Sequence, residues 1–197
     1  MYPYLKRVLD FILSGLGLIV LSPVFLILGI LVKATSPGPV FFPQKRIGRD
    51  KTTFIMLKFR TMRTDAPADT PTHLLKDPYT YITGVGRFLR KTSLDELPQL
   101  WNICKGDMSI VGPRPALWNQ DDLIAERDRY GANGVRPGLT GLAQVRGRDE
   151  LPIGRKAAYD GEYCGDVSFS RDCRIIWQTI SSVLSGKDIN EGGPGRD

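Results

Sequence analysis

The adjacent carboxylates Asp95 and Glu96 are the residues of this sequence best suited to chemistry. Three basic residues, Arg87, Arg90 and Lys91, precede them, and such a cluster suits the charge of a phosphate group. Consecutive helical residues point about 100° apart, so this pair is a poor candidate for the opposed carboxylates of a glycosidase. The two side chains fit two tasks on one phosphate better, one as a nucleophile and one in handling a metal ion or a proton.

The same segment also has a purely structural interpretation. Ser93 followed by Glu96 matches the capping box that begins many helices, and acidic residues in a first turn are stabilised by the helix dipole. That dipole and the nearby cations would keep Asp95 ionised, as a nucleophile must be. The capping and catalytic roles of Glu96 do not exclude each other, and the sequence leaves both open.

Arg114 is a second candidate for binding phosphate. It stands between Pro113 and Pro115 in a segment, residues 112–115, that must be a rigid and extended loop. This rigidity lowers the entropy cost of presenting a guanidinium fork to a phosphate.

Other chemistries are nearly excluded by composition. His73 is the single histidine, which rules against a Ser-His-Asp triad or a multi-histidine zinc site. The cysteines Cys104, Cys164 and Cys173 form no C-x-x-C pair, so we expect reduced thiols rather than a disulfide framework or a zinc site.

The elements that must position these residues form a mostly helical α+β fold with short strands and loops. The chain has 197 residues, of which 42% are hydrophobic and 24% charged, enough for one globular domain with a core. Turn residues and apolar spacing predict the elements. Extended segments are expected at 40–44 and 53–59, a loop at 64–80, helices at 84–90, 93–103, 117–130 and 170–185, and loop or strand at 135–147.

Residues 11–32 carry no charge and are long enough for a bilayer helix. Pro23 lacks an amide proton and its ring clashes with the carbonyl of Ile19, so we expect a kink at Ser22-Pro23, where Ser22 helps to satisfy the freed backbone. The segment 170–185 has a helical apolar stripe that is expected in the core, with partial insertion into the membrane interface as the alternative.

Both flanks of the apolar segment are basic. Lys6 and Arg7 precede it, and residues 36–64 hold seven Lys or Arg against Asp50, out of a net charge of +6 for the chain. The positive-inside rule then places both ends on the cytoplasmic side, which a helix that enters, bends and leaves by the same face satisfies. A plain spanning helix with a proline kink is the alternative. The basic stretch suits anionic headgroups or, alternatively, a solvated loop, and no nucleic-acid motif appears.

In its motifs the chain resembles the bacterial sugar transferases, specifically the small monotopic phosphoglycosyl transferases. The matching segments are Lys6-Arg7-x-x-Asp10, Ser22-Pro23, residues 37–42, 44–48, 58–62, 90–99, 106–115 and 135–141, and Asp160-x-x-Tyr163. In order, they cover about residues 5–188, and their joint match is specific where any single one would not be.

The resemblance implies an enzyme that moves a sugar 1-phosphate from a UDP-sugar to a polyprenyl (undecaprenyl) phosphate, the first membrane step of glycoconjugate assembly. The products would be polyprenyl-diphosphate-sugar and UMP, formed by a ping-pong mechanism through a covalent aspartyl phospho-sugar, with Mg²⁺ required. The alternative is a non-catalytic membrane-surface adaptor that binds anionic lipid or nucleotide sugar. Galactose, glucose and N-acetylated amino sugars all remain open, with a slight preference for the last.

The resemblance also assigns site residues. Asp95 would be the nucleophile, Glu96 its partner, and both would handle the metal. Phosphate binding falls on Arg87, Arg90, Arg114, Lys58 and Arg60, and nucleotide binding on Arg136, Pro137, Gly138, Thr140 and Gly141. Residues 1–35 would form the re-entrant membrane helix, 36–189 the catalytic domain and 190–197 a loose tail. The enzyme would lie at the cytoplasmic face of the bacterial inner (plasma) membrane with anionic lipids and no nucleic acid, and the family hints at a homodimer.

Overall fold

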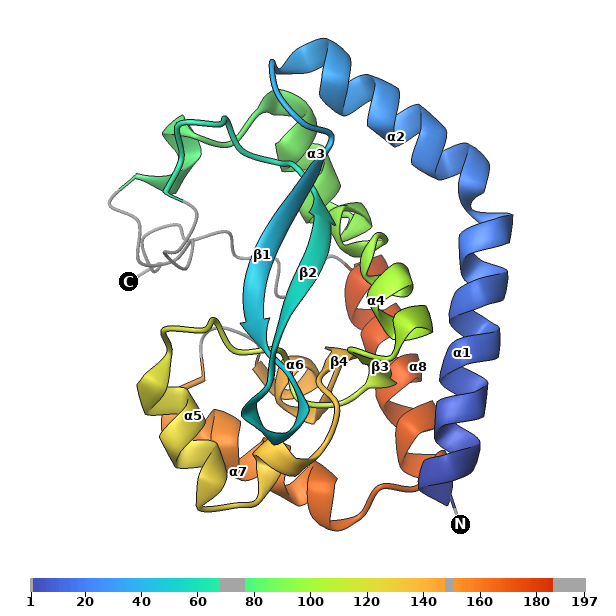
Figure 1. Ribbon diagram of the computed structural model, residues 1–197, viewed down its shortest axis with the longest axis vertical. Coiled ribbons are helices and arrows are strands. Elements are labelled where there is room, and N and C mark those ends of the chain that lie inside the picture. The colour runs from blue at the N-terminus through green and yellow to red at the C-terminus, as the bar shows by residue number, and fades with distance from the viewer. Residues whose placement is uncertain (1, 68–76, 148–150, 186–197) are drawn as a thin grey trace.

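The structure of the protein is a computed structural model that describes residues 2–67, 77–147 and 151–185 (Figure 1). His73 and the tail predicted from residue 190 lie outside the described residues. Helices dominate the described chain, and its strands form two small sheets of two strands each. The predicted α+β class with short strands is therefore confirmed.

The N-terminal helix is broken at the predicted position. Helix α1 spans Tyr2–Val20 and α2 spans Ser22–Thr35, with a bend of 62° between them. Pro23 lies in the first turn of α2, and the Ser22 hydroxyl donates to the Ile19 carbonyl at 2.8 Å. Ser22 thus satisfies the carbonyl that Pro23 leaves without a helical donor.

No described helix is by itself long and apolar enough to cross a membrane, whereas the bent pair α1 and α2 passes that test jointly. Figure 1 shows this pair as an arm along one side of the molecule. Large apolar side chains are exposed along it, including Phe11, Leu16, Ile19, Leu26 and Ile30. Helix α1 begins at Tyr2, nine residues before the apolar segment, so the first arm is longer than the uncharged run alone predicts.

The first turns of α1 are tied to the globular body. Buried Asp10 accepts hydrogen bonds from the Ser109 hydroxyl at 2.6 Å and the Ile110 amide at 3.1 Å. Lys6 pairs at 2.6 Å with Asp172 on α8, which spans Phe169–Ser185. The Lys6-Arg7-x-x-Asp10 motif therefore fixes the apolar arm to the rest of the protein.

The predicted extended segments form a hairpin, although the first strand lies further along the chain than expected. Strand β1, Phe41–Ile47, pairs antiparallel with β2, Thr53–Phe59. A second, parallel pair joins β3, Ser109–Val111, to β4, Gly138–Thr140. A Cβ on Gly138 would stand 2.1 Å from the Gly112 amide nitrogen, so glycine is required for this close approach.

The remaining helices differ from the prediction in several places. They are α3, Gly84–Lys91; α4, Gln99–Lys105; α5, Asp121–Asp128; α6, Leu142–Gly147; and α7, Ile153–Gly165. The segment 117–130 is helical only over α5, and 135–147 resolves into β4 and α6. No helix was predicted over α7, where Gly154 and Gly161 weaken the helical signal.

The predicted continuous helix at 93–103 is wrong. Leu94–Glu96 forms a single 3-10 turn, and α4 starts only after Pro98. Pro98 has no amide to donate to the Leu94 carbonyl, which instead accepts from the Leu97 amide at 3.3 Å. The chain therefore restarts as a new helix, with Pro98 as its N-cap.

One hydrophobic cluster joins the apolar arm to this 3-10 turn. Leu28 and Val32 of α2 pack with Phe59 of β2 and Leu89 of α3, all nearly fully buried. The turn residues Leu94 and Leu97 pack against the same cluster. The segment that carries Asp95 and Glu96 is thus held directly beside the second half of the arm.

Candidate active site

Asp95 and Glu96 lie on the 3-10 turn between α3 and α4. Ser93 enters the turn in the left-handed conformation, with φ of 56°, which is uncommon for a residue other than glycine. Such strained positions cluster at functional sites. Asp95 is buried, with a relative exposure of 8%.

The capping-box prediction is wrong. The Ser93 side chain makes no capping hydrogen bond, because its backbone is left-handed rather than extended as a helix N-cap usually is. Ser93 and Glu96 are instead joined through the backbone, where the Glu96 amide donates to the Ser93 carbonyl at 3.2 Å. The Glu96 carboxylate does not cap the turn and instead accepts hydrogen bonds from Lys58 and Arg114.

Two cations from separate parts of the chain meet at Glu96. Its Oε1 accepts from the Lys58 ammonium on β2 at 2.9 Å and from the Arg114 guanidinium at 3.0 Å. The side chains of Lys58 and Glu96 are mostly buried, whereas that of Arg114 is 37% exposed. The structure therefore brings together Asp95, Glu96, Lys58 and Arg114, four of the residues that the sequence predicted for one site.

The two carboxylates have opposite proton affinities. Burial raises the pKa of Asp95 to about 6, although Lys58 opposes this effect; the charge of Glu96 adds to it. Burial acts on Glu96 in the same direction, but Lys58 and Arg114 outweigh it and hold the pKa of Glu96 far below its usual range. The expectation that the helix dipole and nearby cations keep Asp95 ionised is thus incomplete, because burial opposes them: Asp95 is ionised near neutral pH, yet its charge is poorly compensated. An ionised and poorly compensated carboxylate is a suitable nucleophile.

Arg114 is held by residues to which sequence reasoning gave no role. The Arg127 guanidinium on α5 donates to the Arg114 carbonyl at 2.9 Å and pairs at 2.6 Å with Asp160 on α7. Arg127 and Asp160 are both buried, at 5% and 1% exposure. Asp160 belongs to one of the matching motifs, whereas nothing in the sequence singles out Arg127 beyond its place in the helix predicted at 117–130.

The other predicted phosphate ligands lie differently. Arg90 donates to the Thr61 hydroxyl at 2.8 Å, and its charge lowers the pKa of Asp95. Arg87 is exposed. No contact within the described residues joins it to the pair Asp95 and Glu96, which we call the dyad. The buried Arg60 donates both terminal nitrogens to the carbonyls of Ser36 and Pro37, so it anchors the end of α2, and this geometry does not favour a role in phosphate binding.

The predicted nucleotide-binding segment, residues 136–141, supports the Arg114 loop. The Gly138 amide donates to the Pro113 carbonyl at 2.8 Å, and the Gly112 amide donates to the Thr140 carbonyl at 2.8 Å. Pro137 and Gly141 are buried in the same contact. The glycines of this segment therefore have a packing role, whereas the Arg136 side chain lines two cavities.

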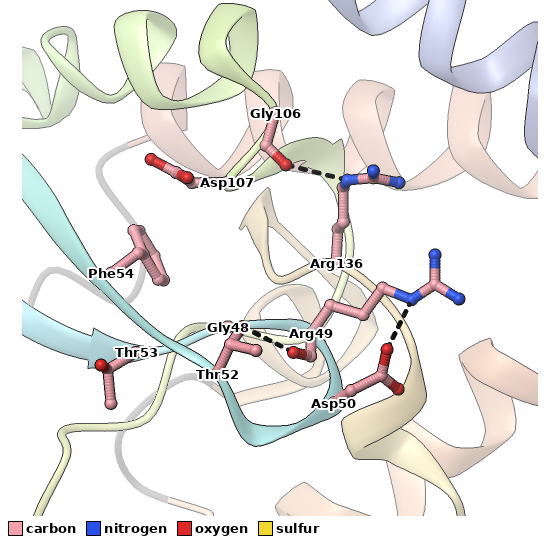
Figure 2. A pocket seen from close by; sticks show the side chains of 9 residues that line it. All are labelled: Gly48, Arg49, Asp50, Thr52, Thr53, Phe54, Gly106, Asp107 and Arg136. Atoms are coloured by element: carbon pink, nitrogen blue, oxygen red, sulfur yellow. Dashed lines mark hydrogen bonds and ion pairs between the residues drawn. The ribbon is translucent and has the colours of Figure 1, made fainter.

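The first cavity lined by Arg136 lies at the tip of the hairpin and has a volume of about 270 Å³ (Figure 2). It is lined by residues 48–50 and 52–54, by Gly106 and Asp107, and by Arg136. Thr53 and Lys58 are separated by five steps of β2, or about 17 Å at 3.4 Å per residue. The cavity is therefore a different place from the dyad.

The dyad has the donor chemistry that Mg²⁺ requires. No cluster of three or more His, Cys, Asp or Glu side chains suited to a metal occurs within the described residues. Mg²⁺ needs fewer, because it is usually held by one or two carboxylates, by substrate phosphates and by water. Asp95 and Glu96 together meet that demand.

Comparison with known proteins shows which family the chain belongs to. A family model described as bacterial sugar transferase matches residues 1–186. The chain is 38% identical over 192 residues to the exopolysaccharide production protein ExoY of Sinorhizobium fredii, covering 90% of this chain and 84% of that protein. It is 41% identical over 189 residues to a UDP-glucose:undecaprenyl-phosphate glucose-1-phosphate transferase of Caulobacter vibrioides, covering 91% and 70%.

A third relative is longer. An uncharacterized sugar transferase of Haemophilus influenzae is 40% identical over 202 residues, which are 92% of this chain but 41% of that protein. The chain belongs to the bacterial sugar transferase family, as its motifs predict.

Proposed function

We propose that this protein transfers a sugar 1-phosphate from a UDP-sugar to a polyprenyl phosphate. The observation that carries the proposal is the arrangement at Asp95: a buried, ionisable carboxylate beside Glu96, which Lys58 and Arg114 hold in an ion-paired cluster. The named activity of the Caulobacter relative and the name of a UDP-galactose-lipid carrier transferase of Erwinia amylovora, 37% identical over 202 residues, support the substrate classes.

In the first half-reaction, an Asp95 carboxylate oxygen attacks the sugar-linked phosphorus of the UDP-sugar. A new bond forms between that oxygen and phosphorus, and the bond from phosphorus to the UMP oxygen breaks, so UMP leaves with the electron pair. Arg114 and Lys58 offset charge on the transferring phosphoryl oxygens. Arg90 lies close enough to lower the pKa of Asp95 and contributes to the same field.

In the second half-reaction, a phosphate oxygen of the polyprenyl phosphate attacks the same phosphorus. The bond between phosphorus and Asp95 breaks, the carboxylate is restored, and polyprenyl-diphosphate-sugar is released. Glu96 holds Lys58 and Arg114 in place through both steps, and it orients the incoming phosphate through them. Mg²⁺, held by Asp95 and Glu96 with substrate oxygens, would supply further charge neutralisation.

We also propose that α1 and α2 enter the membrane as a re-entrant arm at the cytoplasmic face. The 62° bend, the exposed apolar side chains and the basic residues on both flanks support this topology. The packing of Leu28 and Val32 beside the turn that carries Asp95 would then place the dyad next to the bilayer, where the acceptor phosphate of a lipid carrier lies.

The test is the release of UMP from a panel of UDP-sugars by the detergent-purified chain, with Mg²⁺ and a polyprenyl phosphate. The relatives' names favour UDP-glucose and UDP-galactose over the N-acetylated amino sugars. The panel contains all three classes of donor, so that it tests this preference. We expect UMP release with at least one of these donors and its loss in Asp95→Asn. Binding of a UDP-sugar without turnover in any case would favour the adaptor alternative.

A further inference from the structure

A group of basic side chains lies away from the dyad, where the start of α1 meets the hairpin tip. A second cavity there, of about 180 Å³, is lined by Lys6, Arg7, Arg49 and Arg136 and by one acidic residue, Asp10. Arg49 and Arg136 also line the cavity at the hairpin tip, so the two spaces adjoin. Figure 2 shows the side chains of Arg49 and Arg136 extending toward the same side.

The acidic residues nearby do not cancel this charge. Lys6 is matched by Asp172 at 2.6 Å, and Arg49 pairs with its exposed neighbour Asp50 at 3.2 Å. Among the described residues that line this cavity, Asp10 is the one carboxylate left to Arg7 and Arg136, and its two oxygens already accept from Ser109 and Ile110. One positive charge is left over at the second cavity.

The pKa of Arg136 is lowered in the same surroundings. Burial, followed by the charges of Arg7 and Arg49, lowers the pKa of Arg136, and Asp10 opposes them. Like charges held this close repel each other unless an anion lies between them.

The three guanidinium groups keep donors for such an anion. Arg7 donates to the carbonyls of Ile103 at 2.7 Å and Cys104 at 2.9 Å, and Arg136 donates to that of Gly106 at 2.9 Å. Within the described residues, these bonds and the pair with Asp50 use no more than two of the five N–H donors of each guanidinium. The three arginines come from separate parts of the chain, and all three line the second cavity.

We propose that this second cavity is a binding site for a phosphate group, separate from the dyad. Guanidinium forks match phosphate oxygens in pairs, and a cavity of this size accepts a phosphate with a small ester substituent. The phosphate belongs either to a phospholipid headgroup or to a dissolved ion. The first turn of α1 lines the cavity at Pro3, and the neighbouring Tyr4 and Leu5 are exposed apolar residues, so a headgroup is within reach if the arm lies in a bilayer.

The test compares two exposed arginines of the basic stretch. Arg49 pairs with Asp50, and Arg63 pairs with Asp65 in the same way, but only Arg49 lines the cavity. Arg49→Ala is therefore the test variant and Arg63→Ala its matched control. The probes are inorganic phosphate, short-chain phosphatidylglycerol and, as a control lipid without a phosphate, short-chain diacylglycerol, each added to the detergent-purified chain.

The first measurement is the thermal midpoint of unfolding at constant ionic strength. We expect phosphate, phosphatidylglycerol or both to raise it in the wild type and in Arg63→Ala, with at least a tenfold weaker apparent affinity in Arg49→Ala. A response to inorganic phosphate alone identifies a soluble ion, and a response to phosphatidylglycerol alone identifies a headgroup. No response to either probe, or an equal response in all three chains, would overturn the proposal.

The second measurement separates this site from the proposed donor site. We expect the KM for the UDP-sugar to stay unchanged in Arg49→Ala. A KM that rises in parallel with the loss of phosphate binding would make the cavity part of the nucleotide site and would also overturn the proposal. The binding measurement needs no turnover, so it stands even if the proposed transfer reaction fails.

Discussion

The Lys58 ammonium lies 2.9 Å from Glu96 Oε1, and this contact joins the hairpin to the turn that carries the dyad. Phe59, the next residue on β2, is buried in the cluster that also holds Leu94 and Leu97. Lys58 is thus fixed by its strand and Glu96 by its turn, and both are anchored in one core.

The first prediction concerns the cost of keeping Asp95 ionised. Its pKa in the folded protein, about 6, lies above the ordinary value of 3.8, so the ionised form is less favourable in the fold than in the unfolded chain. The free energy of unfolding therefore falls as pH rises through this range, and the full penalty is present above pH 6. Asp95→Asn should raise stability at pH 7.5 by up to about 3 kcal/mol, at 1.36 kcal/mol per pKa unit.

Thermal unfolding in detergent at pH 7.5 and at pH 4 checks this. The stability that Asp95→Asn gains over the wild type should be smaller at pH 4, where Asp95 is largely protonated in the folded wild type. A variant that is less stable than the wild type at pH 7.5 would show that the buried carboxylate is well compensated.

The second prediction concerns the pH dependence of UMP release. Protonation of Asp95 below about pH 6 should suppress the first half-reaction. Lys58 lowers the pKa of Asp95, so Lys58→Met should move the acid limb of the pH profile to higher pH as well as slow the reaction. Lys51→Met on the same hairpin, where the lysine pairs with Asp128 at 3.1 Å on the surface, is the matched control and should leave the limb in place.

An acid limb at the same pH in all three proteins would contradict the role of Lys58.

The sequence identifies those site residues whose type and immediate neighbours in the chain already mark them. Asp95, Glu96 and Arg114 stand out by type and by their proline-flanked or consecutive positions, and Ser22-Pro23 marks its own kink. Lys58 was predicted only from the family motif. The alternation of residues along a strand does not reveal which lysine contacts a carboxylate 38 positions further along the chain, here that of Glu96. Arg127 was missed altogether, because its burial depends on Asp160 from another helix.

The fold was less predictable than the site, for the same reason. The apolar residues of segment 93–103 recur at helical spacing, and this periodicity predicts one continuous helix. It does not reveal that the chain is interrupted between Ser93 and Pro98 by a 3-10 turn. The parallel pair of β3 and β4 depends on glycine contacts between segments that are far apart in the sequence, which no local pattern reveals.

A third prediction tests the support of Arg114. Asp160→Asn leaves the buried Arg127 without its charge partner, and breaking a buried pair of this kind costs about 3–5 kcal/mol. The exposed pair of Arg129 and Glu126 on the same helix region is the comparison, and Glu126→Gln should cost about 1 kcal/mol or less. Chemical denaturation of both variants measures the difference, and equal losses would mean that the Arg127–Asp160 pair is not important for stability.

A fourth prediction tests the topology of the arm. Pro3→Cys and Thr35→Cys, each in a chain whose three native cysteines are replaced by alanine, place a thiol at either end of the bent pair. An impermeant maleimide added outside intact spheroplasts should label neither, and both should react after lysis. Labelling of one position from outside would establish a spanning helix instead.

The most direct test of the central claim is mass spectrometry of the chain after incubation with Mg²⁺ and its UDP-sugar, without polyprenyl phosphate, and a rapid acid quench. We expect a sugar phosphate on the peptide that contains Asp95, its disappearance when polyprenyl phosphate is added, and its absence in Asp95→Asn. Turnover with an unmodified Asp95, or a sugar phosphate on another residue, would contradict this claim.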